Sequence, residues 1–334
     1  MTKILIVAPS WVGDAVLAQP LFRRLRQRFP GLTLDVLAPS WVAALVERMA
    51  EVNQIVLSPL RHGEFNLAQR WKLGRSLANR GYDQAIVLPN SWKSALVPFF
   101  AGIPLRTGFT GEMRFGLLND ARQLDKKQFP LMVERFALLG EQRGAKPEHP
   151  LAHPRLQIPA GRRENTLKRM GLDTQKSVAV FCPGAEYGPA KRWPAKYFAE
   201  LAQRLENYQV WLIGSPNDQP IGEEIRQLSG DIAINLCGKT GLAEAIDLLS
   251  CASLVVSNDS GLMHIAAALD KPMLALYGSS SPAFTPPLSN RAQVLKLDLP
   301  CSPCFQRVCP LGHFNCMMQL TPDQVLTKIE FKKP

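Results

Sequence analysis

The sequence predicts an α/β protein with two Rossmann-like, doubly wound parallel sheets. Three observations predict it. The length of 334 residues suits about two domains, short apolar runs alternate with amphipathic stretches, and this alternation stops once and then restarts. The apolar runs are nearly continuous, which is typical of strands that helices cover on both faces.

In the first half, the apolar runs predict four strands, and the amphipathic stretches between them predict three helices. In the first of these stretches apolar residues recur at helical spacing, with arginines on the opposite face. The predicted strands are residues 3–8, 32–38, 52–58 and 82–89. The predicted helices are residues 15–29, 40–49 and 65–79.

A segment rich in Pro, His, Arg and Lys then separates the first alternation from a second one. We therefore predict a first domain over 1–155, a linker over 156–176, a second domain over 177–320 and a C-terminal tail over 321–334. Ligands of doubly wound sheets bind beyond the carboxyl ends of the strands, so we expect a site in a cleft that the two domains face. The second set of predicted elements comprises strands 177–182, 209–214, 232–236, 254–258 and 273–277, and helices 195–205, 221–228, 242–250 and 261–269.

The chain is basic, with 39 Lys and Arg against 28 Asp and Glu, a net charge of +11. Such a charge favours anionic partners: nucleic acid, an anionic lipid surface or a phosphorylated substrate. The basic residues are spread along the chain without an arginine-rich arm, which favours an anionic substrate or membrane surface over nucleic acid. No apolar run reaches the length of a membrane span or signal peptide, so we expect a cytoplasmic protein.

The first predicted strand runs into Pro9–Asp14, which enters a helix. Ser10 and Gly13 would shape this loop, Gly13 by permitting a tight turn. Asp14 has two interpretations: a cap at the N-terminus of the helix, or a carboxylate that faces the cleft and acts as a general base.

Two segments of the second half are candidates for binding phosphate. Gly184 follows a strand, and Lys191 precedes a helix, so backbone N–H groups and a positive charge could meet an anion there; the alternative is a solvated basic loop. Farther on, Asp259, Ser260 and Gly261 open a helix whose N-terminus suits a pyrophosphate. His264 lies one turn into that helix, either at the site or as an ordinary core residue. The sequence has no G-x-G-x-x-G turn after a strand, so it does not support ordinary dinucleotide binding.

Four cysteines are crowded near the C-terminus with the spacing C-x2-C-x4-C-x6-C: Cys301, Cys304, Cys309 and Cys316. Four thiols this close could form a tetrahedral structural metal site, or they could remain free or redox-labile. A catalytic role is not expected. Because no export signal is evident, disulfides are the less favoured use.

Five long segments, spread over both halves, resemble the lipopolysaccharide heptosyltransferases of glycosyltransferase family 9. They are PSWVGD (9–14), LPNSWKSALVPFFAGIPLRTGFTGEMRFGLLND (88–120), CPGAEYGPAKRWP (182–194), NDSGLMHIAAAL (258–269) and SSPAFTPPLS (280–289). The stretch 88–120 favours the branch that adds the second heptose of the lipopolysaccharide inner core.

The resemblance implies a GT-B fold, with an acceptor-binding N-terminal domain and an ADP-heptose-binding C-terminal domain. It implies an inverting glycosyltransferase that moves L-glycero-D-manno-heptose from ADP-heptose to the first heptose of heptosyl-Kdo2–lipid A. It also implies that the protein is a peripheral membrane protein, cytoplasmic and bound at the inner face of the inner membrane. No Asp-x-Asp pair is evident near the donor loop, so no metal cofactor is expected to be required.

Residue by residue, the resemblance gives Asp14 the role of base and Lys191 a contact to the phosphate and ribose region of the donor. Asp259, Ser260, Gly261 and His264 match the family's donor loop. Asp218 falls near a family carboxylate that contacts the ribose.

Two alternatives stay open. One is another GT-B transferase, either the branch that adds the first heptose or an enzyme with a different nucleotide-sugar. The other is a protein that binds polyanions without turnover, which would show strongly salt-dependent binding.

Overall fold

The computed structural model describes residues 2–61 and 63–330. The chain forms two compact units, Met1–Gln157 and Ile158–Pro334. Each unit has its own parallel sheet and its own hydrophobic core.

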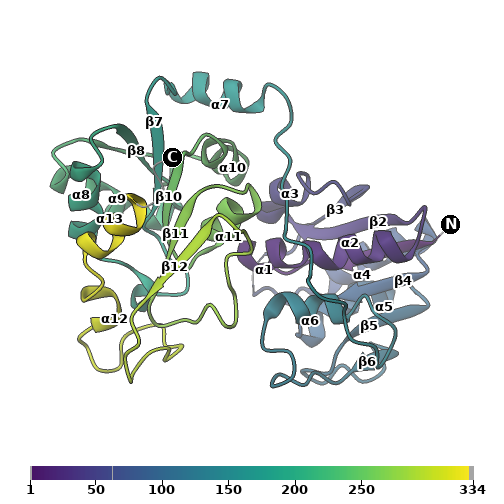
Figure 1. Cartoon of the computed structure of the whole chain (residues 1–334). Helices are drawn as coiled ribbons and strands as arrows, with labels where there is room; N and C mark the ends of the chain where they lie inside the picture. Colours follow the sequence, from purple (N-terminus) through teal and green to yellow (C-terminus); the bar gives the residue numbers. More distant parts are fainter. Residues whose placement is uncertain (1, 62, 331–334) are drawn as a thin grey trace. The chain divides into compact units, whose positions relative to one another are not determined.

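The first unit is a six-stranded parallel sheet in the order β3-β2-β1-β4-β5-β6 (Figure 1). Its strands are Lys3–Val7 (β1), Thr33–Pro39 (β2), Gln54–Ser58 (β3), Gln84–Val87 (β4), Leu105–Phe109 (β5) and Asp120–Arg122 (β6). Its helices are Val12–Leu17 (α1), Gln19–Arg28 (α2), Ser40–Val46 (α3), Leu67–Leu77 (α4), Leu96–Phe100 (α5) and Met132–Leu138 (α6), with short 3-10 turns at Ala78–Arg80 (η1) and Trp92–Ala95 (η2).

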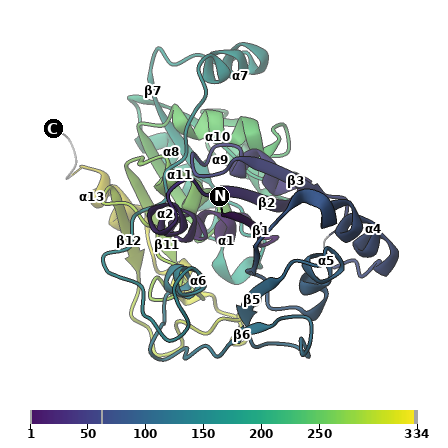
Figure 2. The same cartoon turned by 90° about the vertical axis from the view of Figure 1, so that its right-hand side faces the viewer.

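Helices cover both faces of this sheet (Figure 2). Helices α1, α2 and α6 contact one another on one face, and α4 packs with α5 on the other. Helix α3 packs on α1. The α4–α5 contact is close because Gly74 has no side chain: a Cβ there would lie 2.5 Å from the Cβ of Phe100. The central strands β1, β2 and β4 are almost entirely buried, as their near-continuous apolar runs predicted, whereas β3 and β6 at the two edges are partly exposed.

The second unit repeats the same strand order, β12-β11-β10-β7-β8-β9, again all parallel. Its strands are Ser177–Cys182 (β7), Tyr208–Leu212 (β8), Ala233–Asn235 (β9), Leu254–Asn258 (β10), Met273–Tyr277 (β11) and Ala292–Lys296 (β12). Its helices are Arg162–Met170 (α7), Ala195–Arg204 (α8), Gln219–Leu228 (α9), Leu242–Ser250 (α10), Gly261–Ala268 (α11), Asn315–Met318 (α12) and Pro322–Glu330 (α13), with 3-10 turns at Pro189–Lys191 (η3) and Pro216–Asp218 (η4).

Here α8, α9 and α13 form one layer, and α7, α10 and α11 form the other. A cluster of aromatic side chains packs the first of these layers against the sheet. The rings of Trp193 and Phe198 meet edge to face at 4.8 Å between centroids, and Phe181 contacts Phe198. The predicted class, two doubly wound parallel sheets, is therefore confirmed.

Three features differ from the prediction. The helix expected over 15–29 is two helices, because Pro20 near the start of α2 has no N–H to continue the ladder of α1. The predicted linker contains α7, which is tied to the second unit by a 2.9 Å hydrogen bond from the hydroxyl of Thr166 to the carboxylate of Asp247. Most of the predicted tail is α13, which packs on α8 with Val325 fully buried, while residues 331–334 lie outside the described residues.

Among the residues that the structure describes, no helix is long and apolar enough to cross a membrane.

Candidate active site

In both sheets the strand order reverses between the first and the fourth strand of the unit: between β1 and β4, and between β7 and β10. The loops that leave the carboxyl ends of such strands diverge to opposite faces and leave a crevice for a ligand. Asp14 follows β1, Lys191 follows β7 and Asp259 follows β10. These three candidates thus come from the expected places in the topology.

The second unit brings Lys191 and Asp259 into direct contact. The ammonium of Lys191, at the end of η3, lies 2.6 Å from a carboxylate oxygen of Asp259. The Asp259 side chain is almost fully buried and the Lys191 side chain is mostly so. A partly desolvated cation at a loop edge is suited to an anionic ligand, and the carboxylate holds it in place before that ligand arrives.

A buried asparagine fixes the loop that carries Lys191. The side chain of Asn258 donates to the carbonyl of Pro183 (2.7 Å) and accepts from the backbone N–H of Trp193 (3.0 Å). It is completely buried at the end of β10, so it links both ends of the β7 loop to the neighbouring strand. The sequence analysis did not single out Asn258; a polar side chain ending a buried apolar strand was the available signal.

The N-terminus of α11 adjoins this pair. Ser260 is its N-cap residue, with its hydroxyl accepting from the N–H of Met263, and Gly261 is the first helical residue. His264, one turn in, is buried, and burial lowers its pKa to about 4, with nearby Lys191 acting in the same direction and Asp259 opposing it. The imidazole is therefore neutral at pH 7 and adds no charge to the site.

Gly184 and Asp218 also meet. A Cβ at Gly184 would lie 2.3 Å from the carboxylate of Asp218, so only glycine lets the two loops approach. One oxygen of Asp218 accepts from the backbone and hydroxyl of Ser215, while the other is buried without a hydrogen-bond partner, 3.8 Å from the guanidinium of Arg192. A buried acceptor without a partner suits a ligand hydroxyl.

Further buried polar atoms without a hydrogen-bond partner lie in the loops of the same sheet edge. In the part of the chain that the structure describes, they include the hydroxyls of Thr240, Ser279 and Ser280 and the Nε of Arg192. Sequence reasoning missed these four, since a hydroxyl or guanidinium becomes informative only when its surroundings are known.

In the first unit, Asp14 is partly exposed in the first turn of α1. The N-cap residue is Trp11, so the capping interpretation of Asp14 is not what the helix shows. Gly13 is the second residue of α1, so the tight turn expected at Gly13 lies before it. The carbonyl of Ser10 accepts from the indole N–H of Trp41 at 3.0 Å, which joins the loop after β1 to the start of α3.

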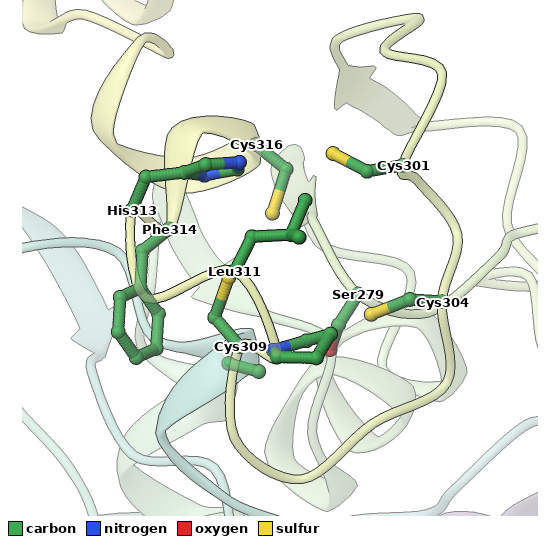
Figure 3. Close-up of a pocket in the computed structure, with 10 residues that line it drawn as sticks. Ser279, Cys301, Cys304, Cys309, Leu311, His313, Phe314 and Cys316 are labelled. Atoms are coloured by element: carbon green, nitrogen blue, oxygen red, sulfur yellow. The ribbon is translucent and has the colours of Figure 1, made fainter.

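The four C-terminal cysteines line one small cavity of about 20 Å³, together with Ala190, Ser279 and the segment around His313 (Figure 3). All four are unbonded thiols. Within the described residues no three His, Cys, Asp or Glu side chains are grouped so that they could hold a metal ion. A structural metal at these thiols stays a prediction.

Taken by itself, the second unit offers a cation, a capped helix N-terminus and several unpaired buried polar atoms at one sheet edge. Such a set suits a diphosphate next to a polar group rich in hydroxyls. The first unit offers a carboxylate in the first turn of the helix that follows β1, which suits the removal of a proton.

Comparison with known proteins gives consistent matches. The family model for glycosyltransferase family 9 (heptosyltransferase) matches residues 70–315. The chain is 47% identical to lipopolysaccharide heptosyltransferase 2 of Escherichia coli K12, over 98% of this chain and 97% of that protein. It is 25% identical to lipopolysaccharide heptosyltransferase 1 of Pseudomonas aeruginosa, over 98% and 97%. The solved structure of E. coli ADP-heptose lps heptosyltransferase II superposes with a TM-score of 0.88 at 45% identity, covering 98% of both chains.

Proposed function

The chain belongs to glycosyltransferase family 9, and from that premise we propose that it is an inverting transferase that moves L-glycero-D-manno-heptose from ADP-heptose to the first heptose of heptosyl-Kdo2–lipid A. The observation that carries the donor half of this proposal is the Lys191–Asp259 pair beside the N-terminus of α11. The greater identity to heptosyltransferase 2 than to heptosyltransferase 1 supports the second heptose as the one transferred.

The reaction is a single displacement at the anomeric carbon. A hydroxyl oxygen of the acceptor heptose forms the new bond, the bond from the anomeric carbon to the phosphate oxygen breaks, and ADP departs with the electron pair. The acceptor hydroxyl loses its proton in the same step, so the enzyme needs a base on one side and charge stabilisation on the other.

Asp14 is the base in this proposal. Its carboxylate is partly exposed, in the first turn of α1 at the carboxyl edge of the first sheet, so an acceptor hydroxyl can reach it. Ser10 and Gly13 flank it and shape the acceptor side of the loop. General base catalysis of this kind contributes about 10²–10⁴ in rate.

Lys191 and the N-terminus of α11 stabilise the departing diphosphate, with Ser260 and Gly261 presenting backbone N–H groups and Asp259 orienting the lysine. The buried carboxylate oxygen of Asp218 that has no hydrogen-bond partner, close to Gly184, is the acceptor for a hydroxyl of the ribose in this proposal. His264, buried in α11, is neutral at pH 7, so Lys191 carries the positive charge at this site.

No divalent cation is required in this mechanism, because Lys191 and the helix N-terminus supply the positive charge that a metal ion would otherwise bring. Transfer in excess chelator should therefore equal transfer with added Mg²⁺. A rate that falls in chelator and returns with Mg²⁺ would contradict this part of the proposal.

We also propose that the first unit contacts the anionic membrane that holds the acceptor lipid. Residues 1–157 carry 21 Lys and Arg against 12 Asp and Glu, a net charge of +9, whereas residues 158–334 carry 18 against 16. A basic surface near an anionic bilayer gains about 1 kcal/mol for each Lys or Arg close to it.

The apolar part of this contact is a surface formed by Phe65, Trp92, Met113 and Phe115. The rings of Phe65 and Trp92 lie 5.0 Å apart, and the backbone N–H of Trp92 donates to the carboxylate of Glu112, next to Met113. Met113 and Phe115 are 85% and 90% exposed. Exposed aromatic and apolar side chains that lie close together are typical of surfaces that bind lipid interfaces.

Two buried arginines fix the backbone on which these exposed side chains are carried. Arg114, between Met113 and Phe115, is only 3% exposed and donates to the carbonyl of Pro89, so its two apolar neighbours are turned to solvent. Arg70 donates to the carbonyls of Phe65 and Lys93, which fixes the backbone under the Phe65–Trp92 contact.

The test of the function is release of ADP from ADP-heptose, with heptosyl-Kdo2–lipid A, with Kdo2–lipid A, and with no acceptor. We expect release only with the acceptor that carries the first heptose. Release only with Kdo2–lipid A would assign the chain to the transfer of the first heptose. Release with neither acceptor would overturn the proposed donor or acceptor, and thermal shifts with ADP and UDP would then distinguish between donors.

A further inference from the structure

The cysteine-bearing segment, residues 301–316, contacts the loop that carries Lys191. The hydroxyl of Tyr187 donates to the carbonyl of Phe305 (2.8 Å), the Nε of Arg307 donates to the carbonyl of Tyr187 (2.7 Å), and the N–H of Ala190 donates to the carbonyl of Arg307 (3.1 Å). Three hydrogen bonds thus join two segments more than 100 residues apart in sequence.

Tyr187 also carries the contact to the lysine itself. The ammonium of Lys191 lies 5.1 Å from the centroid of the Tyr187 ring, and the guanidinium of Arg307 lies 5.3 Å from it. Cations at this distance from an aromatic ring are attracted to it. The backbones are so close that a Cβ at Gly188 would lie 2.4 Å from the carbonyl oxygen of Arg307, so residue 188 has to be glycine.

The same segment is attached to the end of β11. The hydroxyl of Ser302 donates to the carbonyl of Gly278, and the N–H of Phe305 donates to the carbonyl of Ser279, both at 2.7 Å. The segment therefore connects two loops of the sheet edge that holds the donor site, the loop after β7 and the loop after β11.

The four thiols line a cavity between the cysteine-bearing segment and these two loops. Figure 3 shows the side chains of Cys301, Cys304, Cys309 and Cys316 around one cavity, whose wall also includes Ala190 and Ser279. Burial raises the pKa of the Cys316 thiol, and the other three thiols act in the same direction, as expected when four sulfurs are neighbours. Backbone N–H groups, that of Phe314 above all, lower the pKa of Cys309, which favours its reactive thiolate form.

We propose that segment 301–316 is a positioning element for Lys191, with Arg307 and Tyr187 as its positioning residues, and that chemical modification of the four thiols weakens binding of the nucleotide-sugar donor. The proposal rests on the donor role proposed above for Lys191. Arg307 and Tyr187 act on the donor through the loop geometry and the ring contact to the lysine.

The test compares Arg307→Ala and Tyr187→Phe with Val308→Ala, an exposed neighbour as matched control. Loss of the Arg307 contacts should raise KM for ADP-heptose and the Kd for ADP about 10-fold, and loss of the Tyr187 hydroxyl about 3-fold. The KM for the acceptor and the melting temperature of Tyr187→Phe should stay near those of Val308→Ala, whereas kcat should fall together with donor affinity because Lys191 also stabilises the departing diphosphate. Arg307→Lys should restore part of the donor affinity.

The outcomes separate this proposal from the proposed function. Donor constants of Arg307→Ala and Tyr187→Phe equal to those of Val308→Ala, in an enzyme whose wild type transfers heptose, would overturn the positioning role alone. A wild type that neither binds ADP nor releases it would overturn the donor assignment itself.

Iodoacetamide tests the thiols. The thiolate displaces iodide and a sulfur–carbon bond forms, which adds bulk inside the cavity. Alkylation at residues 301–316, located by mass spectrometry, should raise KM for ADP-heptose in the wild type. The quadruple variant Cys301→Ser, Cys304→Ser, Cys309→Ser and Cys316→Ser should show no such rise after the same treatment. Full alkylation at these positions with an unchanged donor KM would overturn the thiol part of the proposal.

Discussion

The two units share one strand order but differ in the exposure of their tryptophans and in their net charge. In the first unit Trp11, Trp41, Trp71 and Trp92 are all exposed, and residues 1–157 carry most of the positive charge. In the second, Trp193 and Trp211 are fully buried and residues 158–334 are nearly neutral.

The function of a doubly wound sheet therefore resides outside its core. The shared core places loops at the same edge in both units, and the residues on those loops and on the outer surface then give each unit its own task. In the function proposed above, the first unit binds the lipid acceptor and the second binds the nucleotide-sugar donor.

The largest expected effect is that of Asp14→Asn in the first unit. Removing the base should lower kcat about 10³-fold, because the acceptor hydroxyl then keeps its proton. ADP affinity, measured by calorimetry, should not change, since the donor groups belong to the second unit. A variant with near-normal turnover would exclude Asp14 as the base.

The second prediction concerns acid stability of the second unit. Because the pKa of His264 is lowered from 6.5 to about 4 in the folded state, the unfolded chain binds a proton between these values and the folded chain does not. Stability is therefore lost as pH falls from about 6.5 to 4, by up to about 3 kcal/mol.

Urea titrations between pH 7 and 4.5 check this. The emission of the buried Trp193 and Trp211 reports the second unit, because the tryptophans of the first unit are already exposed. His264→Gln should flatten the pH dependence; the same slope in both proteins would assign the acid loss to other groups.

Lys191→Ala should lower kcat/KM for ADP-heptose about 30-fold, through the lost contact to the diphosphate. The variant also leaves the buried carboxylate of Asp259 without its cation, which lowers stability. The double variant Lys191→Ala with Asp259→Asn separates the two effects, because it should recover stability without recovering donor affinity. Recovery of both would mean that the lysine acts only structurally.

The smallest expected effect lies on the surface of the first unit. Met113→Ser together with Phe115→Ser should weaken sedimentation with phosphatidylglycerol-containing vesicles about 10-fold. The matched control replaces Leu228 and Ile232, two exposed apolar residues of the second unit, by serine. Equal binding of the two double variants would remove this surface from the membrane contact, and a change in oligomeric state would point to a second copy instead.

The sequence predicted the fold best where strands are central. The runs at 177–182, 254–258 and 273–277 coincide with β7, β10 and β11, because strands buried on both faces read as continuous apolar runs. Strands β5, β6 and β12 went unpredicted. They lie at or near the edges of their sheets and contain Arg106, Gly108, Asp120 and Lys296, which interrupt the apolar pattern.

The site was predictable where residue type and position agree. Lys191 and Asp259 follow strands and carry charge, so pattern and resemblance both select them, and the structure brings them into contact. Asn258 and Arg192 depend on which groups face them across loops distant in sequence. No local pattern encodes that information, and only the packed sheet edge supplies it.

The inward arginine at position 114 has a practical consequence for Met113. Because Arg114 is held in the interior, the thioether beside it is among the most solvent-accessible side chains of the described residues. Peroxide will convert such a thioether to its sulfoxide early, and anything that covers the loop will slow that reaction. Met113 is thus a built-in footprinting probe, and its oxidation rate reports occupancy of this surface without any added label.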